Sequence, residues 1–243
     1  MENKVVIITG GDGFLGKNFV KTLKSAGARV ITWDVAGENS VDITNKGEVQ
    51  KAAREILEKH GQIDVLINNA ALNPQVTKDI QNVNNFASYE DYSIELWEKE
   101  LKVGLTGSFI CAQAVIPSMK KQKSGVIINI GSIYGMHAPD NRMYAEGCFK
   151  SIGYATVKGA IPNFTRTLAS YLGPYGVRVN CFVPGGVYRE QDEEFVKKYS
   201  AKTMLGRMAK ENDYNKALLF MASDDSNYMT GETLVFDGGF GAW

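Results

Sequence analysis

The sequence predicts an α/β domain built on one parallel sheet with helices on both faces. Short β-branched runs alternate with longer segments of helical period along all 243 residues, as strands joined by crossover helices require. No Pro/Gly/Ser-rich linker, internal repeat or low-complexity tract divides the chain. Because crossovers between parallel strands are right-handed, we expect residues 1–243 to form a single doubly wound domain with six to seven strands.

Each strand is expected where a short apolar, β-branched run is bounded by turn residues. The expected strands are Val5–Thr9, Arg29–Trp33, Asp64–Ile67, Gly125–Ile130, Val177–Val183 and Thr233–Phe236. Each helix is expected where apolar residues recur with a period near 3.6. The expected helices are Phe14–Ala26, Lys46–Lys59, Ile94–Lys121, Tyr154–Leu172, Asp192–Tyr199 and Asn212–Ala222. Asn73–Ser93 and Tyr134–Ser151 fit neither pattern and are predicted to be long functional loops.

Composition excludes several function classes. With 44% apolar and 22% charged residues, the chain is neither disordered nor collagen-like. Its 27 basic and 27 acidic residues cancel, so no cationic surplus favours nucleic acid. No apolar run suits a membrane span, the start MENKVVIITG is interpreted as a strand rather than a signal peptide, and no metal site is expected. Three scattered cysteines, Cys111, Cys148 and Cys181, fit a reducing compartment and predict a cytoplasmic protein.

The first strand leads into a glycine-rich turn. Gly11, Gly13 and Gly16 form G-x-G-x-x-G before a predicted helix, a context that favours binding of a dinucleotide pyrophosphate at the helix N-terminus, as in a Rossmann fold. A turn that binds nothing is the alternative. Asp34 ends the second strand, where a carboxylate accepts bonds from ribose hydroxyls and repels a 2′-phosphate. NAD is therefore favoured over NADP, unless Asp34 is only a solvated turn residue.

Several further motifs occur in order along the chain. They are Asp42-Ile43, Asn68-Asn69-Ala70-Ala71, Ser132 after Ile128–Gly131, Tyr154-Ala155-Thr156-Val157-Lys158, Asn180–Gly186 and Asp237-Gly238-Gly239. With the glycine turn, they resemble the short-chain dehydrogenase/reductase family, compact branch, over essentially the whole chain. The resemblance implies an NAD(P)-dependent enzyme, a homodimer or homotetramer built partly from the helices at 94–121 and 154–172, and Ser132, Tyr154 and Lys158 as catalytic residues. The cofactor-binding residues implied by motif and resemblance together are Gly10, Asp12, Gly13, Phe14, Leu15, Asp34, Asp42, Ile43, Asn69, Ala70, Ala71, Tyr154, Lys158, Pro184, Gly185 and Val187.

Three features depart from that family's pattern. The glycine spacing from Thr9 resembles that of the longer members. Gly104 stands where most compact members have a catalytic Asn, which puts a proton relay through that helix in doubt. Tyr154 lies 22 positions after Ser132, a longer spacing than is usual in the family, so the loop between them is expected to be an insertion that shapes specificity. A non-catalytic dinucleotide sensor is therefore an alternative function.

The implied chemistry is hydride transfer between a secondary alcohol and a ketone. Tyr154 and Lys158, four residues apart, share a helix face, and the ammonium is expected to make the phenol acidic enough to act as a base. Ser132 would donate a hydrogen bond to the substrate oxygen. The alternative is an ordinary amphipathic helix face.

The residues and motifs constrain the substrate less than the cofactor. Val103–Gly107, the inserted loop and Pro184–Ala209 resemble oxidoreductases of nonulosonic-acid and flagellin-modification sugar clusters, which implies a polar sugar, sugar phosphate or nucleotide sugar. A lipophilic ketone or 3-oxoacyl substrate is the runner-up. His137, Arg142 and Arg189 are candidate substrate contacts, and Lys150 is another candidate for an anionic group, with solvated surface charge as the alternative. Tyr188–Lys198 is either a lid or a plain surface helix.

Overall fold

A parallel sheet of six strands forms the centre of the computed structural model, which describes residues 1–36, 40–76 and 84–243. The strand order is β2-β1-β3-β4-β5-β6, and all pairings are parallel. The strands are β1 (Val5–Thr9), β2 (Arg29–Trp33), β3 (Val65–Asn68), β4 (Gly125–Ile130), β5 (Val177–Pro184) and β6 (Thr233–Phe236). The predicted fold class is confirmed, with six strands.

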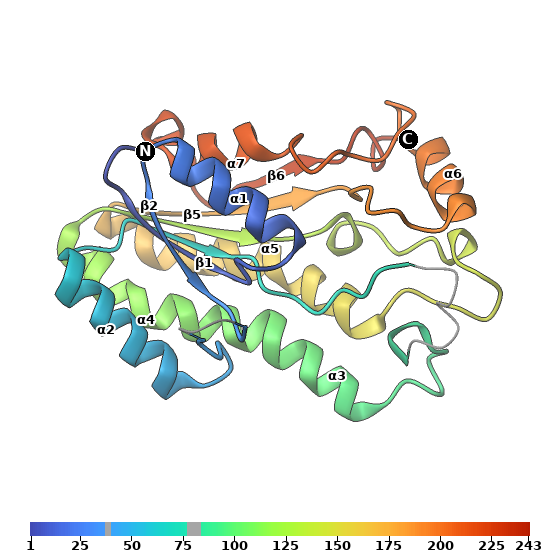
Figure 1. Ribbon diagram of the computed structural model, residues 1–243, viewed down its shortest axis with the longest axis horizontal. Coiled ribbons are helices and arrows are strands. Elements are labelled where there is room, and N and C mark those ends of the chain that lie inside the picture. Colours follow the sequence, from blue (N-terminus) through green and yellow to red (C-terminus); the bar gives the residue numbers. More distant parts are fainter. Residues whose placement is uncertain (37–39, 77–83) are drawn as a thin grey trace.

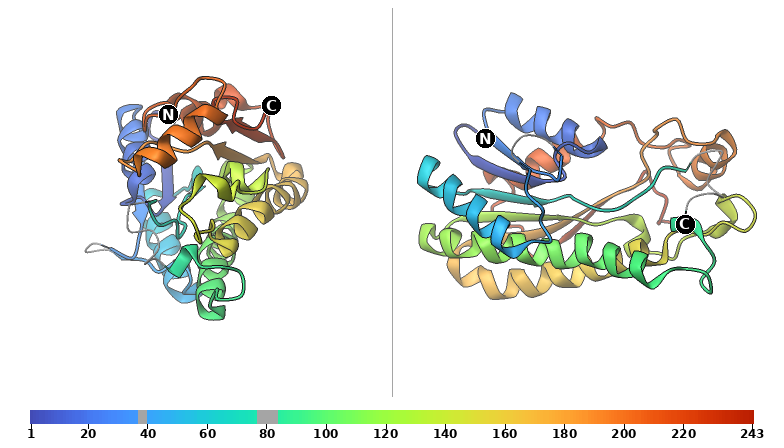
Figure 2. Two further views of the ribbon diagram at one scale, coloured as in Figure 1. Left: turned by 90° about the vertical axis from the view of Figure 1, so that its right-hand side faces the viewer. Right: turned by 60° about the horizontal axis from the view of Figure 1, so that its bottom comes forward.

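Helices cover both faces of the sheet (Figure 1). They are α1 (Phe14–Ser25), α2 (Lys46–His60), α3 (Ile94–Leu101), α4 (Gly107–Gln122), α5 (Ile152–Leu172), α6 (Glu193–Lys202) and α7 (Asn215–Ala222). Helices α1 and α7 pack together on one face, while α2, α4 and α5 cover the other, as the two views of Figure 2 show. The helix that follows β1 lies on one face of the sheet, and the helix that follows β2 lies on the other. The strand order therefore reverses between β1 and β3, and this switch point lies at the carboxyl ends of the strands.

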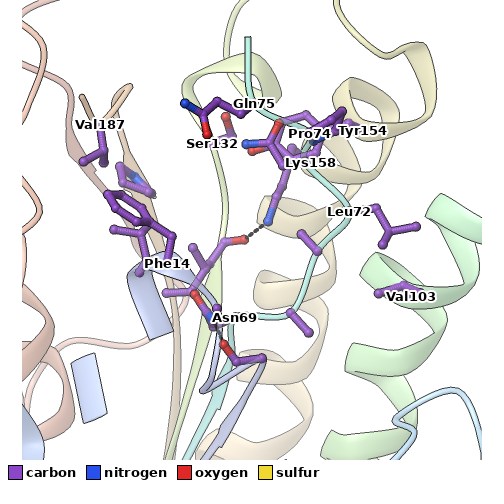
Figure 3. A pocket seen from close by; sticks show the side chains of 18 of the residues that line it. Phe14, Asn69, Leu72, Pro74, Gln75, Val103, Ser132, Tyr154, Lys158 and Val187 are labelled. Atoms are coloured by element: carbon purple, nitrogen blue, oxygen red, sulfur yellow. Dashed lines mark hydrogen bonds between the residues drawn. The ribbon is translucent and has the colours of Figure 1, made fainter. Parts of the chain in front are cut away.

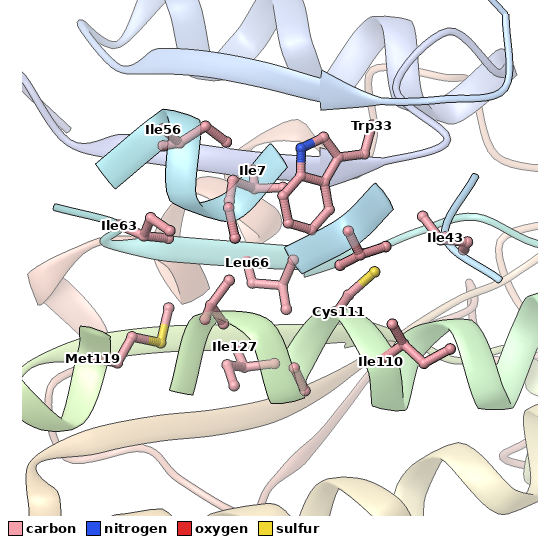
Figure 4. Packing of buried hydrophobic residues seen from close by; sticks show 14 of the residues in the cluster. Ile7, Trp33, Ile43, Ile56, Ile63, Leu66, Ile110, Cys111, Met119 and Ile127 are labelled. Atoms are coloured by element: carbon pink, nitrogen blue, oxygen red, sulfur yellow. The ribbon is translucent and has the colours of Figure 1, made fainter. Parts of the chain in front are cut away.

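Alternation along the strands divides the core into two layers. Successive side chains of a strand point to opposite faces, so Ile7 and Leu66 meet α4, where Cys111 and Met119 are buried (Figure 4). Val6, Ile8, Val65 and Ile67 instead face α1 and α7. Burial on both faces explains why the strands are continuous apolar runs rather than alternating patterns.

Several element boundaries differ from the predictions by a few residues. β3 was expected to begin at Asp64, but the Asp64 side chain accepts bonds from Val5 N and Gln62 Nε2 and the strand begins one residue later. The last two helices also differ: α6 extends to Lys202, and α7 begins at Asn215 because turns occupy the residues before it.

The predicted helix Ile94–Lys121 is not uniform. Residues Lys102–Thr106 form a π-helical segment between α3 and α4, and such segments often mark functional sites. The whole stretch Ile94–Gln122 is long and apolar enough, by length and composition alone, to cross a membrane. Its packing on the sheet and on α5 accounts for those apolar residues.

The two segments that fitted no pattern are loops where the structure describes them. In Asn73–Ser93, residues 77–83 lie outside the described part, and the remainder contains a single short turn of 3-10 helix, Asn84–Phe86. Tyr134–Ser151 lies between β4 and α5 and includes a 3-10 turn at Asn141–Met143. Both loops extend from the carboxyl edge of the sheet, where they are placed to border a site.

Candidate active site

A cavity of about 840 Å³ opens at the carboxyl edge of the sheet. Its lining comes from the segments that follow β1 to β5, together with α3, α5 and α6 (Figure 3). Among the residues expected to bind a cofactor or to act in catalysis, every one lines this cavity. Their separate roles remain predictions, but the fold brings them to one place.

The glycine turn packs directly under the first turn of α1. Gly10 adopts a positive φ of 62°, which favours glycine. A Cβ on Gly16 would lie 2.8 Å from Gly11 Cα, so only glycine lets helix and turn approach this closely. Gly13 is the N-cap and has no side chain to bond the first amides of α1. Those amides and the helix dipole suit an anionic group such as a pyrophosphate.

Asp34 is held beside this turn at the end of β2. Its carboxylate accepts bonds from Asp12 N at 3.0 Å and from Ala36 N at 3.3 Å. Asp42 and Ile43 line the same end of the cavity. A carboxylate at this position can still accept hydroxyl hydrogen bonds, because each oxygen has two lone pairs.

The ends of β3 and β5 close the opposite wall. Asn69 donates to the carbonyls of Thr9 and Gly10, both at 3.0 Å, which ties the turn after β3 to the turn after β1. On the β5 side, Gly185 N donates to Phe236 O at 2.8 Å. These bonds fix the backbone on both sides of the cavity.

Ser132, Tyr154 and Lys158 lie together at the centre (Figure 3). Ser132 follows β4, and the other two lie one turn apart on α5. All three are buried, at 7%, 9% and 4% exposure. Lys158 Nζ donates to Ile130 O at 2.6 Å and lies 5.6 Å from the centroid of the Tyr154 ring. The predicted juxtaposition of phenol, ammonium and hydroxyl is therefore present.

The expected acidity of Tyr154 is not present. Burial raises the pKa of Tyr154, with Ser132 opposing the rise, and burial lowers the pKa of Lys158 to about 8. The ammonium of Lys158 is bonded to the Ile130 carbonyl, and desolvation of a buried phenolate is the largest effect on the pKa of Tyr154. In this state Tyr154 is a neutral phenol and a proton donor.

Comparison with known proteins identifies the architecture around this cavity. The family described as "Enoyl-(Acyl carrier protein) reductase" matches residues 12–241. The 3-oxoacyl-[acyl-carrier-protein] reductase FabG of Thermotoga maritima is 29% identical, with 98% of both chains covered. The 3-alpha-(or 20-beta)-hydroxysteroid dehydrogenase of Mycobacterium bovis is 31% identical, with 97% of this chain and 88% of that protein covered.

A solved structure agrees over nearly the whole chain. The short chain dehydrogenase from Leptospira borgpetersenii, crystallised with bound NAD+, has a TM-score of 0.87 and 34% identity, covering 99% of this chain and 93% of the other. The chain belongs to the short-chain dehydrogenase/reductase family. It is an oxidoreductase of the kind that acts on CH–OH groups.

In this short-chain dehydrogenase/reductase, Gly104 occupies the π-helical segment that faces α5. It is buried, and a Cβ placed on it would lie 2.6 Å from Val157 Cγ1. The position therefore has no space for a side chain. Its carbonyl accepts a bond from Ser108 Oγ at 2.8 Å.

Two candidate substrate contacts lie outside the cavity. Arg142 is exposed and pairs with Asp140 at 2.8 Å, and a strong ion pair within the loop holds it there. His137 is exposed and packs against Gly241 of the C-terminal segment. The structure does not bring these two side chains into the cavity, and their contact with substrate stays a prediction. Arg189 does line the cavity, with its guanidinium 4.4 Å from the centroid of the Phe14 ring.

Sequence reasoning missed several polar residues of the site. Asn73 and Gln75 follow the Asn-Asn-Ala-Ala motif at the end of β3, and Gln191 follows β5. The Gln75 amide donates to Arg189 O across the cavity. These residues follow the carboxyl ends of β3 and β5, and that position in the sequence could have marked them as candidates for the site. Phe195 and Tyr199 also line the cavity, so the segment proposed as a lid borders the site, and its movement remains a prediction.

Metal-binding clusters and reactive thiols are two other kinds of site that the described residues could form. Over residues 1–36, 40–76 and 84–243, no group of three His, Cys, Asp or Glu side chains is placed to hold a metal ion. Cys111, Cys148 and Cys181 are buried thiols, and burial raises the pKa of each. A raised pKa disfavours the reactive thiolate.

Proposed function

We propose that this protein is an NAD-dependent oxidoreductase that interconverts a secondary alcohol and a ketone on a polar, sugar-like substrate. The observation that carries the proposal is the placement of Ser132, Tyr154 and Lys158 in the same cavity as the glycine turn and Asp34. Adjacent catalytic groups and a dinucleotide cradle are the two parts that hydride transfer requires.

The residues present fit an NAD molecule. The packed glycine turn leaves room for a pyrophosphate over the bare N-terminus of α1, and Asp34 favours free ribose hydroxyls over a 2′-phosphate. When bound, the nicotinamide accepts or supplies the hydride. Arg189 borders the glycine-turn side of the cavity through its contact with Phe14.

Side chains of the protein transfer the proton and orient the substrate oxygen. Tyr154 gives a proton to the substrate oxygen in reduction and removes one in oxidation. Ser132 donates a hydrogen bond to the same oxygen, which stabilises its developing charge. Lys158 keeps a buried positive charge near Tyr154, and this charge favours the phenolate when the proton leaves.

The lining of the cavity favours a polar substrate. Asn73, Gln75, Gln191 and Arg189 line the same cavity as Ser132, and polar side chains in a pocket suit a substrate that offers hydrogen bonds. The sequence resemblance to surface-sugar oxidoreductases points the same way and includes sugar phosphates and nucleotide sugars. The runner-up, a lipophilic ketone or 3-oxoacyl substrate, is supported by what the names of the two relatives describe.

Family membership supports an oligomer, and the free cysteines support a reducing compartment. We propose a homodimer or homotetramer in the cytoplasm. Phe109 on α4 and Tyr171 on α5 are 49% and 55% exposed, which suits an interface formed by these two helices. Light scattering of the purified protein tests the oligomeric state, and a monomer at micromolar concentration would contradict it.

The deciding experiment is a panel of sugars, sugar phosphates and nucleotide sugars assayed with NAD+ and NADP+. Turnover with NAD+ is expected, and Tyr154→Phe is expected to lower kcat by about 10²- to 10⁴-fold. NADH binding to this variant, followed by fluorescence, should weaken far less than kcat falls, because the other expected cofactor-binding residues are unchanged. A variant that retains full turnover would refute the catalytic assignment. NADH binding without turnover on any substrate would favour the dinucleotide sensor suggested by Gly104.

A further inference from the structure

Lys150 is a buried lysine at the substrate end of the cavity. The residue is 6% exposed and lines the cavity beside Tyr154. Its Nζ lies 4.4 Å from the centroid of the Tyr154 ring, 5.7 Å from that of Phe86 and 5.8 Å from that of Tyr134. Three aromatic rings therefore surround one ammonium group next to the reacting centre.

The ammonium of Lys150 has hydrogen-bonding capacity to spare. Its Nζ donates to Asn73 Oδ1 at 2.6 Å, and within the described residues this is its one hydrogen bond. An ammonium has three donors, so two remain. The Asn73 Nδ2 group likewise has no protein acceptor in the part of the chain that the structure describes. Two neighbouring side chains thus offer donors to a ligand.

Among the residues that the structure describes, no carboxylate forms an ion pair with Lys150. The described ion pairs, all within 4.0 Å, do not include it. Glu100 attracts it from α3, but Tyr92, Asn85 and Ser151 all bond the oxygens of Glu100. Burial lowers the pKa of Lys150 to about 8, with Glu100 raising it and Lys158 lowering it further. A buried cation without a bonded anion is costly, as expected where a ligand supplies the anion.

The charges lining the cavity are unevenly distributed. The acidic residues that line it, Asp12, Asp34 and Asp42, belong to the turns after β1 and β2. The other charged residues of the described lining are cations, and two of them, Lys150 and Lys158, lie beside Tyr154. The remaining three are Lys99, Lys102 and Arg189. This end of the cavity is electrostatically suited to an anionic substrate.

We propose that Lys150 and Asn73 bind a carboxylate of the substrate, so that the enzyme acts on hydroxy acids and their oxo acids. The inference rests on the proposed function and narrows its substrate class. Because Nζ lies over the Tyr154 ring and the Tyr154 hydroxyl serves the reacting oxygen, the carboxylate is close to the carbinol carbon, as in a 2- or 3-hydroxy acid or a sugar acid. A small, flat monoanion matches a few converging donors better than a phosphate dianion, which favours a larger set of charged donors.

The reaction balances without any further reactant. With NAD+ bound, the carbinol C–H bond would break and its hydride would pass to the cofactor, while the hydroxyl proton would pass to the phenolate form of Tyr154 and then to solvent. The products are the oxo acid and NADH, and the carboxylate stays unchanged. Lys150 contacts the substrate without exchanging a proton with the reacting atoms.

The test compares acids with alcohols in which –CH₂OH replaces the carboxylate. The pairs are lactate with 1,2-propanediol, 3-hydroxybutyrate with 1,3-butanediol, and gluconate with sorbitol, and glycerol 3-phosphate with glycerol serves as the phosphate arm. We expect kcat/KM with NAD+ to be at least tenfold higher for the acid of the best pair. A phosphate preference without an acid preference would overturn the carboxylate assignment.

Substitutions at Lys150 and Asn73 test whether these residues cause the preference for acids over alcohols. Lys150→Met should lower kcat/KM on the acid at least tenfold and on its alcohol less than threefold, and Lys150→Arg should restore part of the loss. Asn73→Asp places a carboxylate against the ammonium and should abolish the preference while the protein remains folded. Lys59→Met, an exposed lysine at the far end of α2, is the matched control. Equal losses on acid and alcohol would mean a structural role only and would refute the proposal.

A binding measurement separates this proposal from the function on which it rests. Malonate is titrated into the enzyme–NADH complex while NADH fluorescence is recorded. We expect malonate to bind to the wild-type complex. The Lys150→Met substitution should raise the dissociation constant of malonate at least tenfold. Binding of malonate without turnover of any pair would support the anion site and refute the proposed activity. Turnover without a preference for acids, and without malonate binding, would support the proposed activity and refute the anion site.

Discussion

Gly104 and Val157 are in contact across α5 and the π-helical segment, at the turn that carries both Tyr154 and Lys158. A Cβ on Gly104 would lie 2.6 Å from Val157 Cγ1. The π-helical segment thus sets how closely α5, and the reactive phenol with it, approaches the preceding helix. Glycine is required at position 104 because the Val157 side chain leaves no space for a Cβ, and not because the backbone has a positive φ.

Gly104→Ala is therefore expected to destabilise the protein by about 1–3 kcal/mol through overpacking. It should also lower kcat/KM by roughly tenfold to a hundredfold, because displaced catalytic groups lose their alignment. Thermal unfolding and steady-state kinetics measure the two effects. Val157→Ala in the same chain should relieve the clash, so the double variant should lose less than the sum of the single losses. Strict additivity would show that the contact is not the cause.

Asp34 is expected to control the choice between NAD and NADP. Asp34→Ala removes the acceptor of the ribose hydroxyls and the charge that repels a 2′-phosphate. We expect kcat/KM for NAD+ to fall about 10- to 100-fold, as loss of a charged hydrogen bond implies, and that for NADP+ to rise. Asp34→Asn, which keeps an acceptor oxygen without the charge, should give an intermediate ratio. An unchanged NAD/NADP ratio in both variants would remove Asp34 from cofactor selection.

The acid preference should depend on pH through Lys150. Because burial lowers the pKa of Lys150 to about 8, the ammonium is present below that pH and is lost as pH rises through it. Lys158 titrates in the same range, but its effect is common to acid and alcohol. The ratio of their kcat/KM values should therefore decline above about pH 8 in the wild-type protein. In Lys150→Arg the ratio should stay level up to pH 10, and a wild-type ratio that does not change would contradict the charge-based mechanism.

Stability should change in the opposite direction from activity at Lys150. The pKa of Lys150 is about 8 in the folded protein against an ordinary 10.5, so the unfolded chain binds the proton more tightly and stability rises with pH between these values. At about 1.4 kcal/mol per pKa unit, removal of the charge is worth about 3 kcal/mol at pH 7. Lys150→Met should accordingly unfold at a higher denaturant concentration at pH 7. The advantage should vanish above pH 10.5, and a destabilised variant at pH 7 would contradict the burial argument.

The fold was predictable because its signals are local. The four central strands are apolar runs buried on both faces. The edge strand β2 is only partly buried, but its β-branched run still predicts its observed bounds, Arg29–Trp33. The π-helical segment was not predictable, because a helical period continues through Lys102–Thr106 and only the contact between Gly104 and α5 distinguishes it.

The cofactor side of the site was predictable for a related reason. Its residues follow directly after strand ends, and parallel strands bring those ends together. The substrate side depends on contacts between distant loops, which no local pattern reveals. Lys150 meets Asn73, 77 residues away, whereas Arg142 of the same loop is held at the surface by Asp140. Both cations were candidates in sequence, and tertiary contacts alone separate them.

The start of α5 is attached to the rest of the protein by buried bonds. Tyr154 N donates to Ser151 Oγ at 2.9 Å, and Ser151 Oγ donates in turn to the Glu100 carboxylate at 2.8 Å. A helix end normally frays before the whole molecule melts, but this one is tied to α3 inside the core. Heat inactivation of the enzyme should consequently coincide with global unfolding. We expect no temperature range in which the start of α5 has unfolded while the rest of the protein remains folded.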